Sequence, residues 1–183
     1  MASTNHNTYN KIGIDHKIGL IQDVLFKNLN LLDVDFYGRV ERVFSKDLRG
    51  NVAEVYVNGK ERKEVYYNDA KAKGGNVFFI ASENSPAVNN NPVEFQNEVR
   101  IVFMLNLKHL YPNESLRMDS EIQAKVSNIL KRTGYAEITG ITTGIESVMN
   151  GFSIDYIRKL NQQPFHIFSV NITIKYNFNS KNC

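Results

Sequence analysis

The chain has 183 residues, a formal net charge of +3 and a hydrophobic content of 42%, which suit one domain with its own core. The mild charge does not indicate a dedicated nucleic-acid binder, whose basic residues would be more clustered. The single cysteine, Cys183, is the last residue, which excludes an internal disulfide and indicates a reducing compartment.

Residues 1–14 are predicted to be an arm that precedes a single folded domain of residues 15–183. Met1–Lys11 is polar, shows no hydrophobic periodicity and lacks the apolar core of a signal peptide. Two interpretations of this arm stay open, namely a frayed terminus and a segment that becomes ordered on a neighbouring subunit. No run in the chain approaches the roughly 18 apolar residues of a membrane span.

The folded part is predicted to begin with an amphipathic helix that is followed by a strand. Apolar residues recur at helical spacing from Asp15, a candidate cap, to about Asn30. The period then changes to two, because apolar residues alternate with polar ones at Val34, Phe36, Val40 and Phe44. This alternation predicts one strand over 34–44.

An extended β-hairpin is predicted over 52–67. Two runs of strand-forming residues flank Asn58-Gly59, the strongest short signal for a hairpin turn. The returning strand carries five consecutive charged residues, Lys60–Glu64, which indicates a solvated strand or an edge that charge protects from pairing. Because these residues bring almost no apolar area, we expect the hairpin to project beyond the core.

Two long strands are predicted to organise the sheet. A short apolar strand at 77–81 and a polar loop at 82–92 lead into the first long strand, Val93–Leu107, which Pro112 ends. The second long strand, Phe165–Phe178, places six apolar residues on one side: Phe168, Val170, Ile172, Ile174, Tyr176 and Phe178. Its other side is rich in Asn and Thr rather than in charge, so we expect that side to meet another protein.

The clearest helix signal lies at 119–132, where Ser120 and Gln123 form a capping-box pattern and Gly134 closes the helix. A strand at 135–142 and a short helix from Thr143 to about Met149 follow, and residues 153–160 fit either a helical turn or a strand. This order predicts an α+β fold with a mostly antiparallel sheet, two long strands, the extended hairpin, and two to three helices packed on one face.

No catalytic or cofactor motif is present, so we predict no enzyme activity, no metal and no cofactor. The four histidines are scattered without metal-ligand spacing, and the chain has no phosphate loop and no nucleophile elbow. Two carboxylate pairs fit solvated strand faces better than Mg²⁺ ligands, namely Asp33 with Asp35 and Glu94 with Glu98.

The candidate functional residues are therefore contact residues, in two groups. The first is the only local basic cluster, which has tyrosines beside it and acidic residues within it: Lys60, Arg62, Lys63, Lys71 and Lys73. The second lies on the polar side of the last strand: Asn171, Thr173 and Lys175. The basic cluster fits a solvated hairpin, and in a ring assembly it would face a DNA-filled channel or a neighbouring subunit.

The order of these elements resembles that of a known family. An N-terminal amphipathic helix, an extended hairpin, a long strand, the helix at 119–132 and the last strand Phe-His-Ile-Phe-Ser-Val-Asn-Ile-Thr-Ile-Lys-Tyr follow one another. This pattern resembles the small tail-terminator, tail-completion and neck connector proteins of tailed bacteriophages. The Asn-rich, Ala-poor composition is similar to that of crAss-like phages, whereas the long polar loop at 82–92 departs from the family pattern.

The resemblance implies a structural virion protein of the neck or tail that is made in the host cytoplasm. Such a protein forms a homo-oligomeric ring, contacts neighbouring virion proteins such as a portal-side connector or the tail tube, and lets DNA pass through its lumen without contacting a membrane. Two alternatives stay open from the residues, namely a small α+β enzyme or ligand-binding domain and a nucleic-acid-binding accessory protein.

Overall fold

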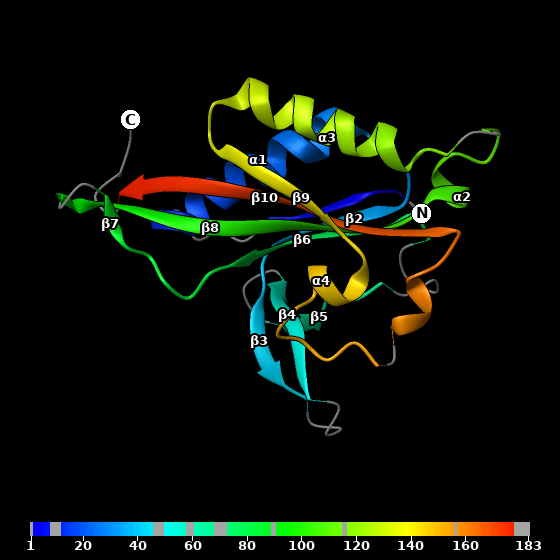
Figure 1. The fold of residues 1–183 in the computed structure, drawn as a ribbon, viewed down its shortest axis with the longest axis horizontal. Helices are drawn as coiled ribbons and strands as arrows, with labels where there is room; N and C mark the ends of the chain where they lie inside the picture. Colours follow the sequence, from blue (N-terminus) through cyan, green and yellow to red (C-terminus); the bar gives the residue numbers. More distant parts are fainter. Residues whose placement is uncertain are drawn as a thin grey trace.

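A computed structural model of the chain describes residues 2–7, 12–45, 50–57, 61–67, 73–88, 91–114, 117–155 and 157–177. Within these residues a large β-sheet lies between two layers (Figure 1). Helices α1 (Gly13–Leu29) and α3 (Asp119–Thr133) cover one face, and a small three-stranded sheet with helix α4 (Ile145–Val148) covers part of the other. The predicted α+β class is confirmed.

The large sheet has seven strands in the order β1-β2-β6-β8-β10-β9, with β7 paired to β8. Strand β2 runs parallel to β1 and β6, and the other pairs are antiparallel, so the sheet is mixed and mostly antiparallel. The bounds are β1 Thr4–His6, β2 Val34–Arg39, β6 Gly75–Ala81, β7 Ala87–Val88, β8 Asn91–Asn106, β9 Glu137–Thr143 and β10 Phe165–Asn177.

The two long strands are confirmed, and they pair with each other. β8 has 16 residues and β10 has 13, and the antiparallel register runs from Phe165 opposite Asn106 to Asn177 opposite Glu94. The predicted first long strand ends too late, because helix α2 (Leu107–Leu110) begins directly after Asn106. The Asn106 side chain caps this helix by accepting a hydrogen bond from the His109 N–H at 3.2 Å.

The alternation of β10 is also confirmed. Ile172 is 1% exposed and belongs to the core beneath α1 and α3, in which Phe103 and Phe168 stack with their ring centroids 4.7 Å apart. The helices contribute their apolar stripes to this core: Ile18, Ile21, Leu25, Ile122, Val126 and Leu130. Burial of such stripes, at roughly 25 cal/mol per Å² of apolar area, is what holds the helices to the sheet.

Helix ends differ from the sequence prediction in their caps. α1 begins at Gly13, so Asp15 lies within its first turn, where its carboxylate contacts the Arg39 Nε at 2.7 Å. The predicted capping box of α3 is not formed, because Gln123 reaches His166 instead of the helix start. Gly134 closes α3 with φ 66°, as predicted, because glycine adopts this left-handed conformation without strain.

The second layer corrects three predictions. The predicted strand over 34–44 is two strands, because the chain leaves the large sheet at Val40 and enters the small sheet as β3 (Glu41–Phe44). The hairpin of β4 (Asn51–Val57) and β5 (Glu61–Glu64) does not project beyond the core, since Val52, Ala53 and Val55 are buried. The helices do not share one face, since α4 and the 3-10 helix Arg158–Leu160 lie with this second core.

The N-terminal segment forms part of the large sheet. β1 pairs with β2, and Asn5 and Asn7 donate to the Asp23 carboxylate of α1 at 2.7 and 3.1 Å. Residues 4–6 of the predicted arm 1–14 are thus an edge strand of this chain's own sheet. Among the described residues, no helix is both long enough and apolar enough to cross a membrane.

Lysine substitutions on the two faces of β10 are expected to differ in their effect on the free energy of unfolding. Ile172→Lys places a charge in the core beneath the helices and is expected to lower the free energy of unfolding by about 3 kcal/mol or more. Thr173→Lys points to the other face, between Glu98 and Glu137 on the adjacent strands, and is expected to fold like the wild type. Urea denaturation of both variants measures the difference, and equal stabilities would contradict this register.

Candidate functional site

A cleft of about 880 Å³ lies where the small sheet meets the open part of the large sheet. Residues of β2, β3, β8, β9 and β10 and the segment after β6 line it. We call it the arginine cleft and define it by its principal polar side chains: Arg39, Arg42, Arg100, Glu83, Glu98 and Asn171. It combines guanidinium, amide and carboxylate groups in one hollow.

Arg100 anchors the floor of the cleft. Its side chain rises from β8, and its guanidinium donates to the carbonyl oxygens of Val148 at 2.8 Å and Asn150 at 3.3 Å. These carbonyls end helix α4 and the turn after it, where a cation is favoured. Burial lowers the pKa of the Arg100 guanidinium, and the positive charge of Arg42 acts in the same direction. The side chain remains charged at neutral pH, since the ordinary pKa of arginine lies far above neutral.

Arg42 forms the opposite wall. Its guanidinium lies over the Phe152 ring, 5.4 Å from the ring centroid, and its Nη1 is 3.8 Å from a carboxylate oxygen of Glu83. The Glu83 side chain is 85% exposed, so this ion pair is weak. Gly151 has φ 92°, a left-handed conformation that favours glycine, and the flexible end of Arg42 lies 2.9 Å from the position that a Cβ would take there.

The third arginine is neutralised within the chain. Arg39 contacts both carboxylate oxygens of Asp15, with its Nε at 2.7 Å and its Nη2 at 3.2 Å. This bidentate pair joins β2 to the first turn of α1. Of the three arginines, Arg39 is thus paired with a carboxylate at hydrogen-bond distance, whereas Arg42 lies 3.8 Å from Glu83 and Arg100 donates to backbone carbonyls.

The predicted contact residues of the last strand lie together at this cleft and beside it. Asn171 is directly opposite Arg100 in the β8–β10 ladder, and its amide donates to the Thr142 Oγ1 at 2.8 Å. Thr173 and Lys175 follow on the same face of β10, opposite Glu98 and Gln96 of β8. Arg42 and Arg100 were not among the predicted site residues. The signal for Arg100 was its place on the polar side of the first long strand, the side that faces the same layer as Asn171.

The structure places the predicted basic cluster differently. Lys60 and Lys71 lie outside the described residues, and Lys73 is exposed. Arg62 contacts Glu41 at 3.2 Å and its Nε donates to the Tyr56 hydroxyl at 3.0 Å. Arg62 is thus occupied on the outer face of the small sheet.

Lys63 is occupied on the inner face of the small sheet. It contacts Asp35 at 3.7 Å and donates to the Tyr37 hydroxyl, and it lies over the Tyr37 ring, 4.8 Å from the centroid. The His6 ring also stacks on the Tyr37 ring, with a centroid distance of 4.6 Å. Arg62 and Lys63 therefore do not form one basic patch, because neighbouring residues of a strand point to opposite faces.

This cluster of Asp35, Tyr37, Lys63 and His6 brings together residue types that also occur in catalytic centres, and its tyrosine is buried. Tyr37 is 1% exposed, so a substrate has almost no access to it. Burial raises the pKa of the Tyr37 hydroxyl, and the Asp35 carboxylate adds to this shift. The phenol therefore stays protonated and donates to Asp35 at 2.8 Å. The cluster joins β1, β2 and β5, and so ties the two sheets together.

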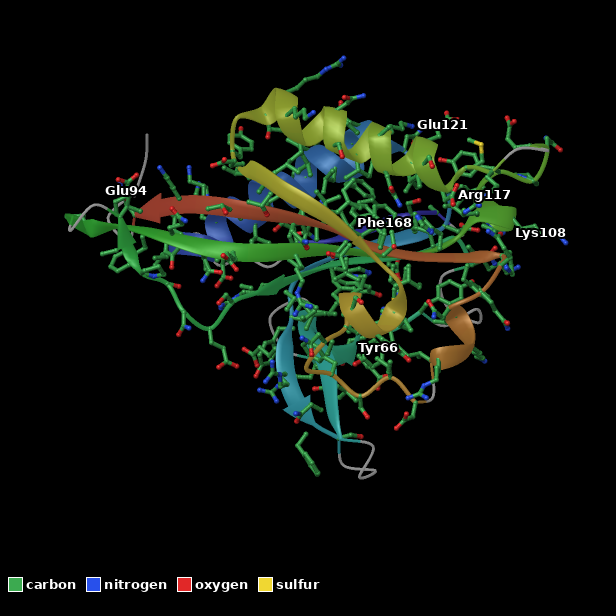
Figure 2. The ribbon with its side chains drawn as sticks, in the orientation of Figure 1. Tyr66, Glu94, Lys108, Arg117, Glu121 and Phe168 are labelled. Carbon is green, nitrogen blue, oxygen red and sulfur yellow. The ribbon has the colours of Figure 1, made fainter. Side chains whose placement is uncertain are left out.

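A second hollow, of about 330 Å³, lies between the start of α3 and the start of β10. His166 and Gln123 meet there with their Nε2 atoms 3.0 Å apart, so the neutral ring accepts the amide hydrogen. Burial lowers the pKa of His166 below its ordinary 6.5, the Asp119 carboxylate opposes this shift, and Arg117 adds to it. Figure 2 shows Arg117 beside the start of α3, with Lys108 of α2 near it.

The two predicted carboxylate pairs have separate environments. Asp33 contacts the His109 Nε2 at 3.1 Å, whereas Asp35 belongs to the cluster with Tyr37. Glu98 lines the arginine cleft, and Figure 2 shows Glu94 near the far end of the large sheet. Within the part of the chain that the structure describes, no group of three or more His, Cys, Asp or Glu residues is placed to hold a metal ion.

Replacing Arg100 is expected to destabilise the second layer. Arg100→Met removes the charged donor of the Val148 and Asn150 carbonyls and is expected to lower the free energy of unfolding by about 1.5–3 kcal/mol. Lys175→Met, a matched change on the exposed end of β10, is expected to alter it by less than about 0.5 kcal/mol. Chemical denaturation measures both variants, and an unchanged Arg100→Met would contradict the anchoring role.

His166 is expected to make stability fall in mild acid. Its pKa is lower in the folded chain than in the unfolded chain, so the unfolded chain takes up the proton first. The stabilisation is complete above pH 6.5 and is lost as the pH falls through the folded-state pKa. His166→Gln should weaken the dependence of unfolding free energy on pH between 7.5 and 5 in urea titrations. A variant with the wild-type dependence would show that His166 is not the group responsible.

Comparison with known proteins does not assign the chain to a family. A scan against protein-family models finds no match, and a search of the curated proteins finds none. The resemblance to phage ring proteins therefore rests on the order of elements and the character of the strands. Any function has to follow from the geometry of the fold and its surfaces.

Proposed function

We propose that this chain is a structural, non-enzymatic subunit of a tailed-bacteriophage virion that assembles into a ring in the neck or tail. The observation that carries the proposal is the overhang, defined as residues 93–98 of β8 with residues 173–177 of β10. On the helix side, Ile174 and Tyr176 of this stretch still belong to the core, whereas Val93 is 41% exposed and Glu94 lies near the far end of the sheet (Figure 2).

The lengths of the elements explain the overhang. The 16 residues of β8 span about 50 Å at roughly 3.3 Å per residue, whereas the 17 residues of α1 span about 26 Å at roughly 1.5 Å per residue. A helix of this length covers only about half of such a strand. Part of the remainder, including Ile174 and Tyr176, still belongs to the core, and the tip beyond these residues favours a role in contact with another molecule.

The two faces of the overhang suit a protein partner. On the helix side, Phe95 stacks on Tyr176 with a centroid distance of 6.0 Å, and Val93 is 41% exposed. On the other side the face is polar and of mixed charge, and it continues into the arginine cleft: Glu94, Gln96, Glu98, Thr173 and Lys175. An apolar strip beside a polar surface is typical of an interface between subunits rather than of a phosphate-binding surface.

The two alternative functions receive less support. A nucleic-acid surface on the hairpin requires available basic groups, yet Arg62 and Lys63 contact Glu41 and Asp35 of the same chain. An enzyme requires a reactive group that its substrate can reach, and the buried, protonated Tyr37 does not supply one. The proposal therefore places the partners among proteins: further copies of this chain, and portal-side or tail-tube neighbours in the virion, with DNA passing through the lumen.

Ring formation is tested with the purified chain. Wild-type protein at high concentration is expected to give closed rings in negative-stain images and a matching mass in sedimentation. Gln96→Glu with Thr173→Lys adds two charges to the polar face of the overhang, the first opposite Lys175 and the second between Glu98 and Glu137. This double variant is expected to fold normally and to assemble at least tenfold more weakly.

The matched control is Ala124→Lys with Asn128→Lys, which adds two charges to exposed positions of α3. This control is expected to assemble like the wild type. A wild-type chain that stays monomeric at every concentration would contradict the proposed function, and equal assembly of the two double variants would show that the overhang is not a contact surface.

A further inference from the structure

The turn over residues 150–152, directly after helix α4, contacts two arginines that come from different sheets. The Asn150 carbonyl accepts a hydrogen bond from Arg100 of the large sheet at 3.3 Å. The Phe152 ring packs against the guanidinium of Arg42, which belongs to the small sheet. One short turn thus brings both guanidiniums into the arginine cleft.

The backbone contacts of Arg100 leave one of its donors available. A guanidinium has five N–H donors, and the bonds to the Val148 and Asn150 carbonyls use those on Nη1 and Nη2. Among the described residues, no acceptor takes a hydrogen bond from the Arg100 Nε–H. The two carbonyls therefore fix the position of the guanidinium, and its Nε edge retains a donor for a further acceptor.

Arg42 is oriented by an aromatic ring rather than by hydrogen bonds. The Glu83 carboxylate is 3.8 Å from the Arg42 Nη1, which is beyond hydrogen-bond distance. In the part of the chain that the structure describes, the Arg42 N–H groups donate no hydrogen bond. The Phe152 ring covers a face of the guanidinium and leaves its rim available, because all five N–H groups lie in the guanidinium plane.

The two guanidiniums repel each other. Arg100 is half-buried, and burial lowers the pKa of its guanidinium, which the positive charge of Arg42 lowers further. Charges that are removed from water are normally paired with an opposite charge, yet no ion pair joins Arg100 to a carboxylate of a described residue. A carboxylate beside both arginines would relieve the repulsion and accept charge-assisted hydrogen bonds from each.

The remaining lining of the cleft favours a carboxylate over a polyanion. Glu83 and Glu98 lie in the same hollow as the arginines. A nucleic-acid strand carries a phosphate at every nucleotide and would bring further negative charges against both glutamates, whereas a single carboxylate can lie beside the arginines alone. The volume of about 880 Å³ is also larger than a free anion requires and is typical of sites that hold larger ligands.

We propose that the arginine cleft binds an aspartate or glutamate side chain in an acidic segment of a partner protein, with Arg42 and Arg100 donating to its carboxylate. This inference goes beyond the proposed function, because a single copy of the chain can bind such a segment whether or not rings form. The exposed Glu83 gives up its weak contact with Arg42 when the partner's carboxylate arrives. Glu83 is therefore a competitor within the chain.

Two peptides that differ only in charge test the site: acetyl-Ala-Glu-Ala-amide and acetyl-Ala-Gln-Ala-amide. Heteronuclear NMR of the full chain follows the arginine Nε–H resonances during titration at low salt. The glutamate peptide is expected to shift the resonances of Arg42 and Arg100, and the glutamine peptide is expected to leave them unchanged. Inorganic phosphate and a short thymidine oligonucleotide are titrated in the same way, and tighter binding of either would overturn the assignment to a carboxylate.

Two variants are expected to change the affinity for the glutamate peptide in opposite directions. Arg42→Gln removes a charged donor and is expected to weaken binding about tenfold. Glu83→Gln removes the competitor and is expected to tighten binding. The matched controls on exposed positions of α3, Arg132→Gln and Glu121→Gln, are expected to bind like the wild type.

The same titrations show how the proposal would fail. Resonances of Arg42 and Arg100 that stay unshifted by the glutamate peptide would overturn it, as would equal affinities of Arg42→Gln and the wild type. The wild-type titration does not depend on any variant folding. Ring assembly is measured separately by sedimentation, so failure of the cleft and failure of the ring function are distinguishable.

Discussion

The antiparallel pairing of β8 with β10 supports both cores of the molecule. Thirteen residues of β10 pair with β8, and the alternation of side chains sends Val99, Ile101 and Phe103 to one face and Val102 and Met104 to the other. α1 and α3 pack on the first set, and the small sheet with α4 packs on the second. Because each strand serves both layers, a change of register by one residue would exchange the contents of the two cores.

Polar side chains add to apolar burial in holding the small sheet and α4 on the large sheet. Lys63 of β5 reaches Asp35 and Tyr37 of β2, and Arg100 of β8 reaches the carbonyls at the end of α4. Hydrogen bonds to charged groups in partly buried sites are stronger than those between neutral groups in water. Lys63, which the sequence places in a basic cluster suited to a partner, thus joins the two sheets of its own chain.

Three surface features follow from the same ladder. The overhang exists because β8 and β10 exceed the helices in length, and the arginine cleft lies where the small sheet leaves the open part of the large sheet exposed. β9 pairs with β10 on one side. On its other side, no strand among the described residues pairs with it. All three features lie on or beside β8, β9 and β10, so one long pair of strands supplies both the folded core and the surfaces for contact.

The sequence by itself determined the elements with regular periodicity. The period of two along 165–178 and 93–107 predicted two long strands and the buried side of each, and the stripe over 119–132 predicted α3 with its closing Gly134. These signals are local, because each depends on side-chain direction within one element. The polar side of β10 was also correctly located, since Asn171, Thr173 and Lys175 lie on the face away from the helices.

Tertiary structure alone decided what those elements meet. The strand at 34–44 is divided at Val40 between two sheets, whereas the apolar residues at 34, 36, 40 and 44 predicted a single strand. The charges of 61–64 predicted a projecting hairpin, whereas the apolar side of β4 is buried against residues far along the chain such as Met104 and Ile145. The presence of Arg42 and Arg100 in one cleft likewise depends on where β3 packs on the large sheet. These contacts join residues far apart in the chain, and the period of a single segment carries no information about its distant neighbours.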